Sequence, residues 1–194
     1  MPCDFYHLHT HTKYSVADAM IKPKELAKFL NENNIDKYAI TEHGAMFNMP
    51  EFYSELKDKG IELIVGMEAY VAPNSRLDKN GKADMANHHL VLLAENNTGY
   101  KNLLKIASDA TLNGFYRNPR TDRDFLEKHH EGLIATSACL GGSVQRFLSA
   151  GMFEEAKADA LNYERIFGKG NFYLEIQRHN LEEQDKINPD IVRL

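Results

Sequence analysis

Three histidines at alternate positions are the clearest candidates for chemistry in this sequence. His7, His9 and His11 fall within the segment HLHTHT. Alternate side chains of an extended segment point to the same side, so two neighbouring imidazoles can chelate one metal ion or each take one ion of a pair. Asp18 follows in KYSVADAM, close enough to fold back as a carboxylate ligand. Mixed imidazole and carboxylate ligation suits zinc, manganese or iron rather than calcium.

Further potential ligands stand near the ends of apolar segments expected to form strands. They are Glu42 and His43 after Lys37–Thr41, Glu68 late in Glu62–Val71, Cys139 after Leu133–Thr136, and His179 after Asn171–Ile176. In a parallel α/β fold the working site lies at the carboxyl ends of the strands, so these side chains are expected to meet at one rim. His88 and His89 are the exception, because they stand at the start of the apolar run HLVLLA.

Each candidate also has an ordinary structural interpretation. A histidine at a strand end is often a hydrogen-bonded surface residue, which is the interpretation favoured for residues 129–130 in LEKHHEG. Cys139 alone fits a small buried apolar residue. Glu68 in the run IVGMEAYV is harder to explain in this way, since a buried carboxylate without a partner is costly. The spacing of His9 and His11 favours a metal site over a structural role.

Apolar strand patterns alternate with helical patterns along the chain. The predicted strands are Asp4–Thr10, Lys37–Thr41, Glu62–Val71, His89–Ala94, Leu133–Thr136 and Asn171–Ile176, and the predicted helices are Pro23–Asn33, Pro50–Lys59, Tyr100–Ala110, Ser143–Ser149, Phe153–Phe167 and Leu181–Leu194. This alternation indicates an α/β fold with a parallel sheet or barrel rather than an antiparallel fold.

Two polar segments interrupt this pattern. Residues 72–87 are expected to form a mobile surface loop. A second loop, residues 113–123, carries Arg117, Arg120 and Arg123. These arginines are candidates for contact with a phosphate backbone, and a solvated loop is an equal alternative.

Composition limits the class of protein. The chain has 194 residues, with 28 acidic and 23 basic side chains and a formal net charge of −5, so bulk electrostatics does not favour wrapping of nucleic acid. Its length predicts one domain. Cys3 and Cys139 cannot make a disulfide framework, which fits a reduced cytoplasmic setting. Neither a signal peptide nor an apolar run of about 18 residues is present.

These motifs resemble the PHP (polymerase and histidinol phosphatase) domain, in the branch found at the N-terminus of bacterial DNA polymerase III alpha subunits. The resemblance extends over residues 1–194 and rests on HLHTHTKYSVADAM, AITEHGAMFNMPEFY, GIELIVGMEAYVAP, HHLVLLAENNTGYKNLLKIAS, GLIATSACLGGSV and FYLEIQRHNLEEQDKIN. It implies a distorted seven-stranded (β/α) barrel. Because the family's final Asp-x-His motif is absent, the chain is expected to be the front part of a longer polypeptide, cut before the last strand.

The resemblance also implies two or three divalent ions, zinc, manganese or iron, at the strand ends. The implied ligands are His9, His11, Asp18, His43, Glu68, His89 and Cys139. Among them Glu68, His9, His11 and His43 are the implied catalytic residues, with Glu68 bridging two ions. His7 and Glu42 are expected to orient ligands through hydrogen bonds, and His179 to lie beside the site.

The activity implied by the resemblance is that of a metal-dependent phosphoesterase, in the form of a proofreading 3′–5′ exonuclease acting on a primer 3′ end. The parent protein would carry out DNA synthesis for replication in the cytoplasm, using magnesium elsewhere in its chain. Its expected partners are DNA, a proofreading subunit and a sliding clamp, with no membrane. Two alternatives stay open: a stand-alone phosphatase of the histidinol-phosphate type, and a metal-binding scaffold without catalysis of its own.

Overall fold

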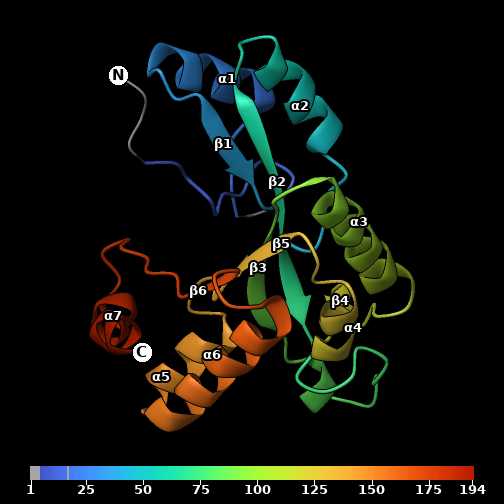
Figure 1. Cartoon of the computed structure of the whole chain (residues 1–194), viewed down its shortest axis with the longest axis vertical. Helices are drawn as coiled ribbons and strands as arrows, with labels where there is room; N and C mark the ends of the chain where they lie inside the picture. Colours follow the sequence, from blue (N-terminus) through green and yellow to red (C-terminus); the bar gives the residue numbers. More distant parts are fainter. Residues whose placement is uncertain (1–4, 17) are drawn as a thin grey trace.

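A six-stranded mixed sheet organises residues 5–16 and 18–194, which are the residues that the computed structural model describes. The strands are β1 (Lys37–Ile40), β2 (Glu62–Val71), β3 (His88–Ala94), β4 (Arg120–Thr121), β5 (Leu133–Thr136) and β6 (Phe172–Tyr173). Their order is β1-β2-β3-β5-β6, and β4 pairs with β2. The long strand β2 connects the end of the molecule that holds β1 to the end that holds β3 and β4 (Figure 1).

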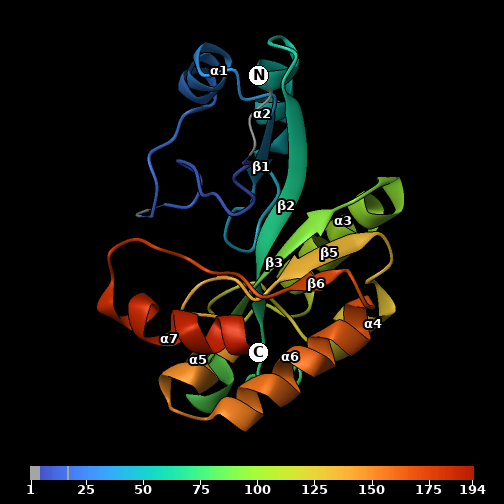
Figure 2. The same ribbon diagram turned by 60° about the vertical axis from the view of Figure 1, so that its left-hand side comes forward.

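Helices cover both ends of this sheet. They are α1 (Pro23–Glu32), α2 (Met49–Lys57), α3 (Asn97–Leu112), α4 (Arg123–Lys128), α5 (Ser143–Ser149), α6 (Phe153–Phe167) and α7 (Glu182–Arg193), with a short 3₁₀ turn, η1, at Ala83–Met85. Figure 2 shows α5, α6 and α7 together below the sheet, while α1 and α2 lie at the opposite end of β2. Among the described residues no helix has the length and apolar character needed to cross a bilayer.

Local sequence explains where several helices begin and end. Pro23 occupies the first turn of α1, where its missing N–H is not needed. The side chain of Asn96 caps α3 by accepting from the N–H groups of Thr98 and Gly99. The side chain of Asp122 caps α4 in the same way. Gly60, with φ +71°, follows α2.

The direction of β3 differs from the parallel sheet predicted from sequence. β1–β2, β2–β4 and β5–β6 are parallel pairs, but β3 runs antiparallel to both β2 and β5. This reversal accounts for the exceptional position of His89 in the sequence. Because β3 starts where its neighbours end, His89 pairs with Tyr70 near the end of β2 and reaches the same rim as Glu68.

Both faces of the central strands are buried. Leu90 and Leu92 of β3 belong to the large core with Leu103 of α3, whereas Val91 and Leu93 join a smaller core on the other side. His89 shares the face of Val91 and Leu93, since side chains alternate along a strand. The packing of β3 therefore places His89 on the face of the smaller core and His88 on the face of the larger core.

Two predicted strands are shorter or less regular than expected. Residues 5–11 form no regular strand; they lie beside β1 through two hydrogen bonds, from Ala39 N–H to the carbonyl of His7 at 3.1 Å and from Thr41 N–H to that of Thr10 at 2.9 Å. Asp4 lies outside the described residues. The strand predicted at Asn171–Ile176 shrinks to β6.

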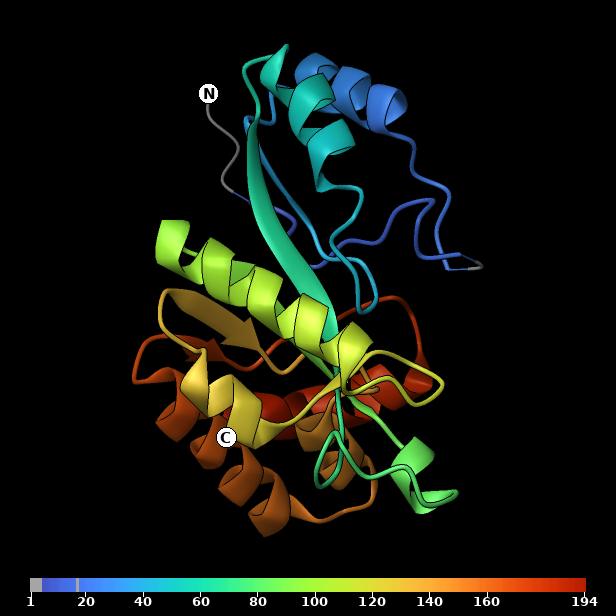
Figure 3. The same ribbon diagram turned by 90° about the vertical axis from the view of Figure 1, so that its right-hand side faces the viewer.

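The segment 72–87 lies at the surface but is tied down at several points. Its Arg76 pairs with Asp109 of α3 and, at 3.0 Å, with Asp122. The guanidinium of Arg120 also donates to the backbone carbonyl of Asp84 in this segment. Figure 3 shows the segment looping out at the lower right. These contacts hold the segment in place, so it differs from the mobile loop predicted from the sequence.

Candidate metal centre

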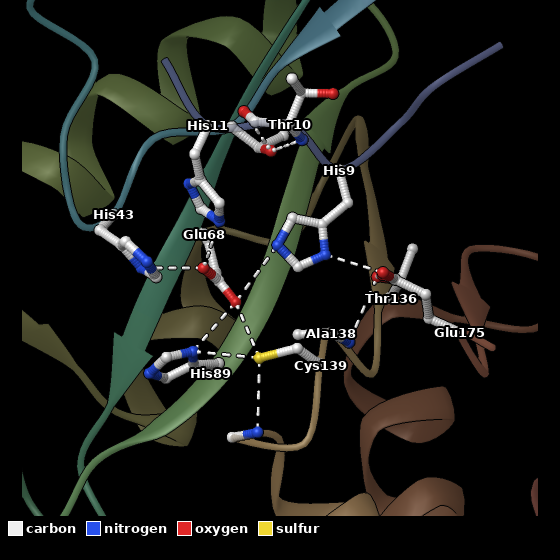
Figure 4. Close-up of polar contacts among 12 residues, drawn as sticks. His9, Thr10, His11, His43, Glu68, His89, Thr136, Ala138, Cys139 and Glu175 are labelled. Carbon is white, nitrogen blue, oxygen red and sulfur yellow. Dashed lines mark hydrogen bonds and ion pairs between the residues drawn. The ribbon is translucent and has the colours of Figure 1, made fainter. Parts of the chain in front are cut away.

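The carboxylate of Glu68 lies at the centre of four imidazoles (Figure 4). The distances to the ring nitrogens are 3.3 Å for His9 Nε2, 3.0 Å for His11 Nε2, 2.8 Å for His43 Nδ1 and 3.0 Å for His89 Nδ1. Only 1% of Glu68 is exposed. The site is therefore a buried carboxylate enclosed by nitrogen donors, at the rim predicted from sequence.

Backbone pairing with β2 brings His43 to this carboxylate. Glu68 N–H donates to the carbonyl of Glu42 at 3.0 Å, and Gly44 N–H donates to the carbonyl of Glu68 at 2.9 Å. Gly44 has φ +60°, and a Cβ at this position would lie 2.7 Å from the ring of Pro119. A glycine is thus required where the chain turns after the ligand.

Cys139 completes the lower side of the cluster. Its Sγ lies 3.5 Å from Glu68 Oε1 and 3.4 Å from His89 Nδ1, and it accepts from Gly141 N–H at 3.3 Å. Burial and the nearby charge of Glu68 raise the pKa of the Cys139 thiol to about 12. A divalent cation reverses this effect, because a coordinating thiol is deprotonated.

Asp18 forms the outer edge of the cluster. Its side chain is half exposed, and Oδ2 lies 3.4 Å from His43 Nε2 and 3.9 Å from His11 Nε2. The rings of His11 and His43 stack at 4.1 Å. The described residues contain three overlapping groups with metal-ligand spacing: His9, His11 and Glu68; His11, Asp18 and His43; and His43, Glu68 and His89.

Two buried ligand atoms in the cluster lack the hydrogen bonds that a buried polar atom normally has. Within the described part of the chain, His43 Nδ1 and Glu68 Oε2 are both without a hydrogen-bond partner, although they lie 2.8 Å apart. Two ligands of one ion, each about 2 Å from it, lie about 3 Å apart, so a single ion fits between these two atoms after a small shift. Imidazole, carboxylate and thiol donors in this arrangement fit zinc or another divalent transition metal.

The electrostatics of the cluster follow from its mixed charges. Burial opposes ionisation of Glu68, but the four surrounding imidazoles outweigh it and hold the pKa of this carboxyl below its usual range. Burial likewise opposes protonation of His9, yet hydrogen bonds to Glu175 and Glu68 raise its pKa to about 10. The metal-free cluster therefore holds protons that a metal ion would displace.

Glu175, beyond the end of β6, is a functional residue that the sequence reasoning missed. Its Oε1 lies 2.7 Å from His9 Nδ1 and accepts from Gln177 Nε2 at 2.8 Å, while Oε2 accepts from the Thr136 hydroxyl at 2.5 Å. A carboxylate on the far nitrogen of a ligand histidine fixes the ring and its tautomer. Glu175 thereby aims His9 Nε2 at Glu68. The sequence feature that could have revealed Glu175 is its position as the single acidic residue in the apolar run FYLEI.

Glu42 organises the loop that carries two ligands. It is 1% exposed and accepts from the N–H and hydroxyl of Thr12, from the Ser15 hydroxyl and from Asn48 Nδ2. The Ser15 oxygen also lies 3.3 Å from His11 Nδ1 and accepts from the backbone N–H of His43 at 3.2 Å. Glu42 thus lies behind the ligands, as the resemblance implied.

His7 does not take the orienting role expected of it. It is exposed, and its ring packs against Phe5 at 5.2 Å and Tyr38 at 5.9 Å. His179 is linked to the cluster only indirectly: its ring contacts Gln184, which donates to Gln177 at 3.3 Å.

The three candidate phosphate-binding arginines have different surroundings. Arg117 is exposed. Arg123 pairs with Asp159 and lies over the ring of Tyr163 at 4.8 Å. Arg120 has no exposed surface, and its guanidinium donates to backbone carbonyls. The expected phosphate contact is therefore wrong for Arg120, because its donors are already used inside the protein.

Tyr70, at the end of β2, was also not singled out in the sequence. Its ring stacks on His43 at 5.7 Å and meets His89 edge-on at 5.3 Å. Burial and the negative charges of Glu68 and Asp18 raise the pKa of Tyr70, so its hydroxyl stays protonated. The ring of Tyr70 therefore covers one side of the cluster.

Known proteins are similar to this chain in sequence and in fold. DNA polymerase III subunit alpha of Borreliella burgdorferi is 45% identical over 190 residues, covering 97% of this chain and 16% of that protein. The protein of the same name from Thermus aquaticus is 44% identical over 188 residues, covering 95% of this chain and 15% of that protein. The chain thus spans about a sixth of the length of these relatives.

A solved structure resembles the fold, and a family model matches the sequence. A crystal structure assigned as a metal-dependent phosphoesterase from Bifidobacterium adolescentis has a TM-score of 0.52, with 13% identity over 97% of this chain and 83% of that one, so the likeness concerns the fold. The family model of the PHP domain matches residues 7–179. The chain therefore belongs to the PHP domain family.

Proposed function

We propose that this chain is a metal-dependent phosphodiesterase domain within a replicative DNA polymerase of the alpha-subunit type, and that it removes nucleotides from the 3′ end of a DNA primer strand. The observation that carries the proposal is the pair of buried ligand atoms, Glu68 Oε2 and His43 Nδ1, without hydrogen-bond partners in the described chain. The identity of about 45% to named polymerase subunits supports the polymerase context.

The residues of the cluster have separate roles in this proposal, as metal ligands or as groups that orient them. His9, His11, His43, His89, Asp18, Glu68 and Cys139 would hold two or three divalent ions. Zinc, manganese or iron there would supply positive charge for the phosphate oxygens and would acidify the attacking water. Glu68 is central, since it shares its two oxygens among four histidines. Glu175 would keep His9 turned toward the ions, and the half-exposed Asp18 would be the ligand most open to solvent.

Finer features of the family belong to the same proposal. A further strand carrying Asp-x-His would close a seven-stranded barrel and add two ligands. The parent protein would be cytoplasmic, would polymerise DNA with magnesium in another region, and would contact a proofreading subunit and a sliding clamp. The length of the relatives, about six times that of this chain, supports such additional regions. Exposed Arg117 remains a candidate contact for the DNA backbone.

The experiment uses the full-length protein, loaded with zinc or manganese, and a 5′-labelled single-stranded oligonucleotide. We expect shortening from the 3′ end that is lost in His9→Ala and Glu68→Ala but kept in His130→Ala, a histidine outside the cluster. DNA synthesis by the same preparations reports that the variants fold. Hydrolysis of a phosphomonoester without action on DNA would instead identify a phosphatase. If neither substrate is hydrolysed, the domain is a metal-binding scaffold without catalysis of its own.

A further inference from the structure

An exposed aromatic ring follows the candidate ligand His43 by four residues and rests on other aromatic rings. Phe47 is 68% exposed. Its ring meets Tyr14 edge-on at 5.6 Å and 85°, and Tyr14 in turn meets the fully buried Phe52 at 6.5 Å and 74°. The Tyr14 hydroxyl is anchored on Glu51 of α2. The ring of Phe47 is thus presented to solvent on a fixed base that is continuous with the core.

The loops that carry this pair are those that carry the ligands. Phe47 lies four residues after His43, and Tyr14 lies three residues after His11. The Ser15 hydroxyl contacts both His11 and the backbone of His43, and so ties the two loops together at the cluster. In Figure 3 residues 11–16, 18–20 and 41–48, in dark and light blue, project on the same right-hand side of β2.

The chemistry around the ring suits a nucleotide better than an apolar partner. Lys13 Nζ lies 4.8 Å from the centre of the Tyr14 ring and 3.5 Å from Glu51 Oε1, so a cation stands beside the aromatic pair. Unpaired bases stack on exposed aromatic faces, while nearby lysines meet the phosphates. A phosphate held at the metal centre would bring the attached base to the loops that carry the ligands, one of which presents the exposed Phe47.

We propose that Phe47, supported by Tyr14, is the stacking platform for an unpaired nucleobase whose phosphodiester lies at the metal centre, with Lys13 beside the neighbouring phosphate. This inference rests on the proposed function and names the substrate class of that site: the frayed, single-stranded end of a nucleic acid. Stacking is tolerant of base identity, so the platform selects for an unpaired end and not for a sequence.

The direct test measures stacking rather than cleavage. The full-length protein binds an oligonucleotide that carries 2-aminopurine at its 3′ end and phosphorothioate linkages that slow hydrolysis. The fluorescence of 2-aminopurine falls when it stacks. We expect Phe47→Ala to bind roughly 10-fold more weakly and to lose part of the quenching, as expected for one lost base–aromatic contact. Phe47→Tyr should behave as the wild type.

A matched control is Phe29→Ala on α1, because Phe29 is 57% exposed but lies away from the ligand loops. It should leave binding and quenching unchanged. An oligonucleotide with an abasic 3′ end should bind equally to the wild type and Phe47→Ala. Equal quenching by the wild type and Phe47→Ala with the base present would overturn the platform. A wild type that hydrolyses no phosphodiester overturns the proposed function instead, while the fluorescence still decides the platform.

Discussion

Two buried clusters of charge in this molecule differ in how completely their polar atoms are satisfied. Around Arg120, four guanidinium hydrogen bonds end on backbone carbonyls, those of Gly114, Asp84, Arg76 and Asp78. Around Glu68, one carboxylate oxygen and the Nδ1 of His43 have no hydrogen-bond partner in the described residues. Buried polar groups in native proteins are normally paired. The first cluster therefore serves the fold, whereas the second has the ligand atoms and spacing that suit a metal ion.

Residue chemistry explains the difference. Arginine carries only donors, which match carbonyl oxygens and leave no room for a cation. Imidazoles, a carboxylate and a thiol are metal ligands, and they bind an ion in their deprotonated forms. Burial alone, common to Arg120 and Glu68, does not identify a functional site. What distinguishes Glu68 is that its unpartnered oxygen faces the unpartnered Nδ1 of His43 at 2.8 Å.

Removing the satisfied cluster should give the largest loss of stability. Arg120→Met leaves four backbone carbonyls without their donor, so the free energy of unfolding should fall by about 3 kcal/mol or more. Urea titration followed by circular dichroism measures the loss. The number of bound metal ions should stay that of the wild type, and a fall in metal content at unchanged stability would reverse the roles of the two clusters.

Glu175→Gln tests the support of the second cluster. The amide no longer carries the charge that holds His9 Nδ1, and loss of such an outer partner weakens metal binding by roughly 10- to 100-fold. Competition with a chromophoric chelator measures the affinity. Glu62→Gln, an exposed carboxylate on β2 that pairs with Lys37, is the control and should bind metal as the wild type does. Equal affinities for both variants would remove Glu175 from the site.

Arg76→Lys should have a smaller effect on the fold. The guanidinium contacts Asp109 and Asp122 at once, and an ammonium cannot reproduce this two-sided contact. We expect a loss of about 1 kcal/mol in the free energy of unfolding, since charge-assisted hydrogen bonds contribute about 1.5–3 kcal/mol and lysine keeps part of this. Thermal unfolding with matched metal content checks it, and a loss as large as that of Arg120→Met would be unexpected.

The smallest predicted effect is a change in the number of protons released when the metal binds. At pH 8 the His9 imidazole, with a pKa of about 10, and the Cys139 thiol, with a pKa of about 12, are both protonated in the metal-free protein. Metal uptake should therefore release about two protons. Cys139→Ser should release about one fewer. Calorimetry in two buffers of different ionisation enthalpy counts them, and heats that do not depend on the buffer would contradict both assignments.

Strong local patterns made much of the fold predictable. The bounds of β2, β5, α5 and α6 match those predicted, because each has an uninterrupted apolar pattern between clear breaks. The reversal of β3 was not predictable, since a run buried on both faces carries no mark of direction. Residues 5–11 alternate like a strand, but their backbone hydrogen bonds from Ala39 and Thr41 do not form a continuous ladder with β1.

The candidate site was predictable where the residue type itself signals chemistry. His9, His11, His43, His89, Glu68 and Cys139 meet as expected. Glu175 escaped notice because its partner, His9, lies 166 residues away in the chain. Arg120 was misread because its burial depends on residues 72–87 folding over it, a long-range contact that no local pattern reveals.

Elemental analysis of the full-length protein, purified without added metal, tests the central claim that the cluster around Glu68 is completed by ions. We predict two or three zinc, manganese or iron ions per chain in the wild type. Glu68→Gln should retain at most one, because Glu68 belongs to two of the three ligand groups in the described residues. A folded wild type without bound metal, or a Glu68→Gln variant with the same metal content as the wild type, would contradict the account.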